Sequence, residues 1–70
     1  MATIVELRRD LGWTQLELAR QARLNPNTVR KAESGEPVSG PTAAAIAEAF
    51  SKAFGQQILV RDIEGLNVSL

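Results

Sequence analysis

The sequence of 70 residues contains neither cysteine nor histidine. Without cysteine, no disulfide framework can stabilise so short a chain. Without either residue type, a structural zinc site and a cysteine or histidine nucleophile are both excluded. The acidic residues are scattered and form neither a calcium loop nor a carboxylate dyad, and no glycine-rich phosphate loop is present. We therefore expect no metal, no cofactor and no enzymatic activity.

Long apolar runs are also missing from the sequence. The longest run, from Ala43 to Ala47, is far too short to cross a bilayer. The N-terminus lacks the charged-then-apolar order of a signal peptide. These absences predict a cytoplasmic protein without membrane contact, and the length predicts a single domain over residues 1–70.

The eight basic and eight acidic residues cancel to a net charge of zero. Neutrality counts against nucleic-acid binding, because counterion release supplies much of the affinity of nucleic-acid binders. The charges are nevertheless unevenly placed. Residues 1–35 carry six basic and four acidic side chains, whereas residues 36–70 carry two basic and four acidic ones. The first half is therefore the more positive part of the chain.

Two short helices are predicted in the middle of the first half. A helix over Gln15 to Ala22 follows Thr14, which forms the sequence pattern of a capping box with Glu17. A second helix over Pro26 to Glu33 follows Asn25, a favoured N-cap, and starts with a proline that needs no N–H at this position. Their connection is only about three residues long.

Two further helices flank this pair. The first starts near Ile4 and ends at Gly12, and the last runs from Pro41 to just before Gly55. We expect Trp13 to lie in the core. The predicted inward stripe of the last helix is Ala43, Ile46, Ala47, Phe50, Ala53 and Phe54. The fold class is therefore all-α, a compact bundle of four or five helices that contains a helix-turn-helix.

The motif resembles the helix-turn-helix of the Cro and phage-repressor (lambda-repressor-like, XRE) family. The resemblance rests on Thr-Gln-Leu-Glu-Leu-Ala at residues 14–19, Ala-Arg-Leu at 22–24 and Glu-Ser-Gly at 33–35, and it extends over roughly Ile4 to Gly55. It implies a lambda-repressor-like bundle. It also implies a sequence-specific transcriptional regulator of the repressor type, which binds a palindromic operator in double-stranded DNA through the major groove.

The polar residues that the motif presents outward are the candidate DNA-contacting residues: Thr14, Gln15, Asn25, Pro26, Asn27, Thr28, Arg30 and Lys31. The resemblance implies that Gln15 bonds a phosphate and buttresses the recognition helix, and that Thr28 lies on the phosphate side. It implies positions facing base edges for the N-cap of the third helix and three residues within it: Asn25, Pro26, Asn27 and Lys31. Arg8 and Glu33 match a partly buried structural ion pair that ties the first helix to the end of the third.

Two residues depart from the family pattern. Arg23 stands where the family mostly has a turn glycine, so either a residue with positive φ or a different turn is expected. Pro26 stands where a side chain such as glutamine often reads a base, and proline cannot donate a hydrogen bond. Direct readout is therefore expected to depend chiefly on Asn27, Lys31 and Arg30.

The tail after Gly55 can be interpreted in two ways. The run 58–60 could be a short extended segment, and residues 61–64 could form one helical turn before Gly65. The tail contains more apolar residues than a small core needs: Ile58, Leu59, Val60, Ile63 and Leu66. Some should cap the bundle and the remainder should form a two-fold interface. We therefore expect a homodimer, in solution or only on DNA.

Two other functions fit the sequence. The first is the antitoxin of a toxin–antitoxin pair, which would bind a partner protein through the tail or through the face that carries Leu16. The second is a helix-turn-helix used only for protein interaction. The neutral charge and Pro26 favour this second alternative, whereas the polar outer face of the third helix argues against it.

Overall fold

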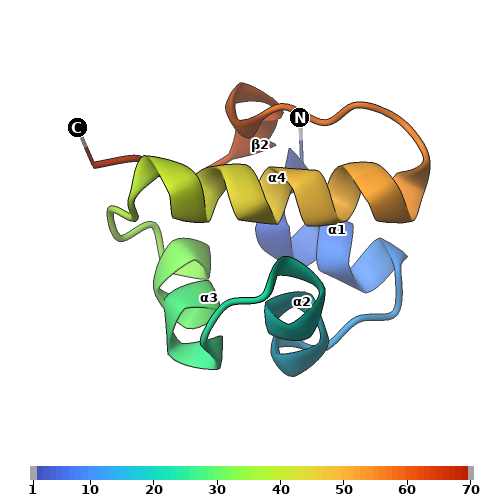
Figure 1. The fold of residues 1–70 in the computed structure, drawn as a ribbon, viewed down its shortest axis with the longest axis horizontal. Helices are drawn as coiled ribbons and strands as arrows, with labels where there is room; N and C mark the ends of the chain where they lie inside the picture. The colour runs from blue at the N-terminus through green and yellow to red at the C-terminus, as the bar shows by residue number, and fades with distance from the viewer. Residues whose placement is uncertain (1, 70) are drawn as a thin grey trace.

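The computed structural model describes residues 2–69 and confirms the all-α fold class. The elements are β1 (Ala2–Thr3), α1 (Ile4–Asp10), α2 (Gln15–Ala22), α3 (Pro26–Glu33), α4 (Gly40–Phe54), the 3-10 turn η1 (Val60–Asp62) and β2 (Ile63–Glu64). Figure 1 shows α4 lying across the bundle, with α2 and α3 packed next to each other beneath it. No helix within residues 2–69 is long and apolar enough to cross a membrane.

The helix starts follow the capping residues in the sequence, with one exception. Thr14 Oγ1 accepts a hydrogen bond from the Glu17 N–H at 3.1 Å, as predicted. A capping box also predicts that the Thr14 N–H donates to the Glu17 carboxylate. This prediction is wrong, because the carboxylate instead accepts from Gln21 Nε2 at 2.8 Å, one turn further along α2. A complete capping box forms at α1, where Thr3 and Glu6 exchange both bonds.

The capping box at α1 is sensitive to pH. The Thr3 N–H donates to Glu6 Oε1 at 2.9 Å, and this hydrogen bond holds the pKa of Glu6 below its ordinary value of 4.5. Because folding lowers the pKa of Glu6, the contact stabilises the folded state at pH values above the ordinary pKa of 4.5. Its contribution is lost as the pH falls through the pKa of the folded state.

The core lies where α4 crosses the other helices. Its largest fully buried side chains are Phe50, Leu18, Ile46 and Val29. Trp13 is half-buried and stacks on Phe50, with ring centroids 6.0 Å apart. The predicted stripe of α4 is wrong at Ala53, which is exposed, whereas Ala49 is buried in its place. Ala49 lies beside residues of α2, so the buried face of α4 extends toward that helix.

The tail closes the open end of the bundle. β2 pairs in parallel with β1, so that Ala2 faces Ile63, and Val38 forms an isolated bridge with Val68. The prediction of an extended run at 58–60 is wrong at its end, because Val60 already starts η1. Apolar tail residues pack against the core: Ile58, Val60, Ile63, Leu66 and Val68. They mainly cap the bundle.

Arg23 adopts the left-handed conformation that the family's turn glycine would adopt, with φ 58° and ψ 46°. It is the only non-glycine residue with positive φ within residues 2–69. The turn therefore keeps its geometry although the residue type departs from the family pattern. The Leu24 N–H closes the turn by donating to the Ala19 carbonyl at 2.8 Å.

Replacing Arg23 by glycine is expected to raise the free energy of unfolding by about 0.5–1 kcal/mol. The left-handed conformation costs an L-residue about 1–2 kcal/mol, and the greater freedom of glycine in the unfolded chain offsets part of this gain. Urea unfolding measures the difference. The matched variant Arg20→Gly, inside α2, should instead destabilise by about 1 kcal/mol. A neutral or destabilising Arg23→Gly would contradict the assigned strain.

Candidate nucleic-acid interface

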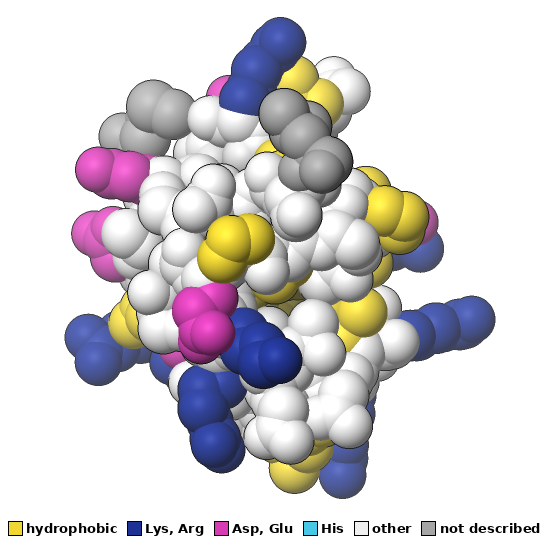
Figure 2. Space-filling model, turned by 90° about the vertical axis from the view of Figure 1, so that its left-hand side faces the viewer, with side chains coloured by type: hydrophobic (Ala, Val, Ile, Leu, Met, Phe, Trp, Pro, Cys, Tyr) yellow, Lys and Arg dark blue, Asp and Glu magenta, His cyan; other side chains and the backbone are white. Residues whose placement is uncertain are grey.

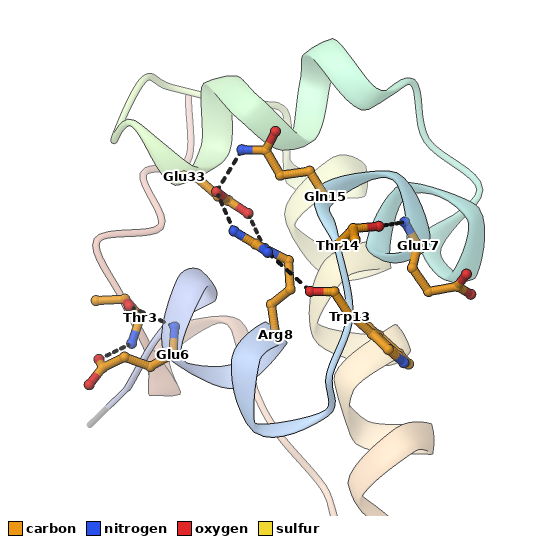
Figure 3. A network of polar contacts seen from close by, with 8 residues as sticks. All are labelled: Thr3, Glu6, Arg8, Trp13, Thr14, Gln15, Glu17 and Glu33. Atoms are coloured by element: carbon orange, nitrogen blue, oxygen red, sulfur yellow. Dashed lines mark hydrogen bonds and ion pairs between the residues drawn. The ribbon is translucent and has the colours of Figure 1, made fainter.

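Glu33, at the end of α3, is the centre of a hydrogen-bonded network that joins three helices. Arg8 of α1 donates to it twice, from Nε to Oε2 at 2.8 Å and from Nη2 to Oε1 at 3.3 Å. Gln15 of α2 donates from Nε2 to Oε1 at 2.8 Å. Figure 3 shows both side chains converging on the carboxylate. We call Arg8, Gln15 and Glu33, with the Trp13 carbonyl, the Glu33 network.

The fourth member of the Glu33 network is a backbone group. Arg8 Nη1 donates to the Trp13 carbonyl at 3.0 Å, so the same guanidinium also holds the segment that leads into α2. This contact could not be predicted from the sequence, because its acceptor is a backbone carbonyl, which every residue carries. The side chains of Arg8 and Glu33 are only 15% and 8% exposed. The network therefore fixes the start of α2 relative to the end of α3.

The start of α2 holds two of the candidate residues. Thr14 is exposed and uses its hydroxyl oxygen to accept from the backbone. Gln15 is half-buried, and its Nε2 is bonded to Glu33. The first N–H groups of a helix have no partner within the helix, and they carry the positive end of its dipole. A phosphate placed at the start of α2 would therefore meet backbone donors held in position by Gln15.

The outer face of α3 carries the remaining candidates. Asn25, Pro26, Asn27, Arg30 and Lys31 are exposed, and Thr28 is half-buried. The opposite face of the helix is completely buried at Val29 and Ala32. The structure thus brings the candidates together on one side of the helix pair, while Thr14 and Gln15 lie at the start of the neighbouring helix.

The two asparagines at the start of α3 differ in what they can still bind. Asn25 Oδ1 accepts from the Asn27 N–H at 2.8 Å and so caps the helix. The amide of Asn27 takes part in no side-chain hydrogen bond within the part of the chain that the structure describes, and neither do the charged ends of Arg30 and Lys31. Asn27, Arg30 and Lys31 therefore present unused polar groups to solvent.

The charge distribution supports the same surface. Figure 2 shows Lys and Arg side chains concentrated in the lower half of the molecule, which holds α2 and α3 in Figure 1. The helix pair and its turn carry Arg20, Arg23, Arg30 and Lys31, all exposed. In contrast, Glu33 is nearly buried and compensated by Arg8. The neutral chain therefore presents a locally positive surface around the exposed face of α3.

Two short helices, joined by a tight turn and with an exposed polar face on the second, define a helix-turn-helix DNA-binding domain. The chain belongs to the Cro-type helix-turn-helix family, whose model matches residues 4–55. This family consists of DNA-binding transcription regulators and is typically not enzymatic. Comparisons with curated proteins and with solved structures gave no significant match.

Proposed function

We propose that this protein is a sequence-specific transcriptional regulator, a repressor, that places α3 in the major groove of a palindromic operator. One observation carries the proposal. The Glu33 network ties the end of α3 to α1 and to the start of α2. In contrast, Asn27, Arg30 and Lys31 are exposed on the outer face of α3, and their side chains have no partners in residues 2–69. Rigid support behind a row of unused polar groups is what base readout requires.

The exposed groups have distinct roles in this proposal. The Asn27 amide has both a donor and an acceptor available, which matches the N7 and N6 groups of adenine. Lys31 lies one turn further on the same face and can donate to guanine O6 or N7. Arg30 binds a phosphate or a base edge. Thr14, Gln15 and Thr28 lie beside the DNA backbone and set the register of α3 on the duplex.

Selection from randomised duplex DNA, followed by sequencing, tests the proposal. We expect one enriched site made of two inverted half-sites, with centres about one helical turn (10–10.5 base pairs) apart. If no sequence is enriched over the starting pool, the proposed function is wrong.

Asn27→Ala is expected to lower affinity for the enriched site about tenfold and to remove the preference at a single base pair, because a bidentate contact is lost. Gln15→Ala should lower the affinity for all DNA sequences by the same factor, because Gln15 holds the start of α2 and contacts no base. A repeated selection with each variant measures the site preference, and a binding titration measures the affinity. Asn67→Ala and Gln21→Ala are matched controls outside the proposed interface. An unchanged site preference for Asn27→Ala would contradict its role.

The dimer of the proposal is expected to form on the operator. Within residues 2–69 the only exposed large hydrophobic side chain is Leu16, at 50% exposure. A stable interface buries about 800 Å² per partner around an apolar centre, and little apolar surface is left for it. Sedimentation should give a mass near 7.6 kDa for the free protein and two chains per operator duplex. One chain on a duplex with both half-sites would contradict the two-fold arrangement.

A further inference from the structure

Pro26 is the one apolar side chain among the exposed residues at the start of α3. Its ring has no hydrogen-bond donor and no acceptor. The preference of proline for the first helical position explains why it is tolerated there. In the major groove, the same residue presents a small, rigid apolar surface where a polar reader would otherwise stand.

The neighbouring side chain is engaged in the helix cap. Asn25 Oδ1 is bonded to the Asn27 N–H at 2.8 Å. A bidentate contact from Asn25 to adenine would have to use the second lone pair of that oxygen in the orientation that the helix cap fixes. Asn27 is the next residue along and has its amide available. The base pair that faces the first turn of α3 thus meets the proline ring instead of an amide.

The major groove offers one apolar group, the 5-methyl of thymine. The other base edges present polar atoms there, which would lose water against the ring of Pro26 without gaining a hydrogen bond. Resting on the proposed function, we propose that Pro26 selects the 5-methyl group of a pyrimidine, which is thymine in unmodified DNA. The selected base lies beside the base pair that Asn27 reads.

Removal of single methyl groups tests this inference on the site enriched by the full chain. Each thymine of a half-site is replaced in turn by deoxyuridine, which lacks only the methyl group. We expect one position, next to the pair identified by Asn27→Ala, to lose about fourfold in affinity, the value of one buried carbon group. Replacement in both half-sites should cost about fifteenfold, since the two contacts add.

Two proline variants assign the methyl contact to its residue. In Pro26→Ser, the duplexes with thymine and deoxyuridine at that position should bind equally well. Pro41→Ser is the matched control, because Pro41 is also an exposed proline in the first turn of a helix but lies in α4. This control should keep the fourfold difference. Thermal unfolding of both variants verifies that they are folded.

A cytosine series separates the methyl group from the rest of thymine. At the sensitive position, a duplex with 5-methylcytosine should bind about fourfold more tightly than one with cytosine. Equal binding would mean that the O4 atom of thymine is read, and the inference would be wrong. It would also be wrong if no thymine were sensitive or if Pro26→Ser stayed sensitive. Those results would overturn the inference about Pro26 but not the proposed function, because an enriched site would still exist. The absence of any enriched site would overturn both.

Discussion

Phe50→Ala is expected to remove most of the free energy of unfolding at 25 °C. The Phe50 side chain is 0% exposed and packs at the point where α4 crosses the bundle. Truncating a buried phenylalanine costs about 3–5 kcal/mol, because the transfer free energy is lost and a cavity remains. A domain of this size has a free energy of unfolding of about 5 kcal/mol. Circular dichroism and urea unfolding measure the loss directly.

The aromatic neighbours of Phe50 make the expected loss larger than for an isolated side chain. Its ring stacks on Trp13 at 6.0 Å and lies 6.4 Å from Phe54, and such pairs add about 0.5–1.5 kcal/mol. Phe50→Leu, which keeps most of the volume, should cost only about 1–2 kcal/mol. If Phe50→Ala lost less than about 1.5 kcal/mol, the position of the core would be wrong.

Arg8→Ala is expected to cost about 2–4 kcal/mol, the second-largest effect. The variant leaves the Glu33 carboxylate, only 8% exposed, with Gln15 as its remaining partner, and it removes the donor to the Trp13 carbonyl. Breaking one partner of a buried pair is costly because a charge stays uncompensated. Part of the pair reaches solvent, so the value lies below that of a fully buried pair. Thermal and urea unfolding measure it.

A double variant separates the structural role of the Glu33 network from its role in positioning. Replacing the pair by apolar side chains, as in Arg8→Met with Glu33→Leu, should recover most of the stability that Arg8→Ala loses. DNA affinity should nevertheless remain low, because Gln15 has lost the acceptor that holds it. Full recovery of both stability and DNA affinity would show that the network has no positioning role.

Local chemistry made the helix-turn-helix predictable from the sequence. The bounds of α2 and α3 follow from Thr14, from Asn25-Pro26 and from apolar spacing, all of which act within a few residues. The outer face of α3 was predictable for the same reason, since helical periodicity places Asn27 and Lys31 opposite Val29. Which bases these residues contact stays a prediction.

Contacts between distant parts of the chain were not predictable. β2 is a strand only because Ala2 and Thr3 lie beside it, at the other end of the sequence. Ala49 is buried instead of Ala53 because α2 packs against that side of α4. Similarly, the bond from Gln15 to Glu33 depends on how two helices meet. None of these pairings leaves a signal in local composition or period.

The most direct test of the central claim, that α3 reads a DNA sequence, is a pair of binding titrations at physiological salt. One uses the enriched duplex, and the other uses a shuffled duplex of the same length and composition. Because the net charge is zero, attraction to DNA in general should be weak. We expect the enriched duplex to bind at least about a thousandfold more tightly. Equal affinity for the two duplexes would contradict sequence-specific recognition by this protein.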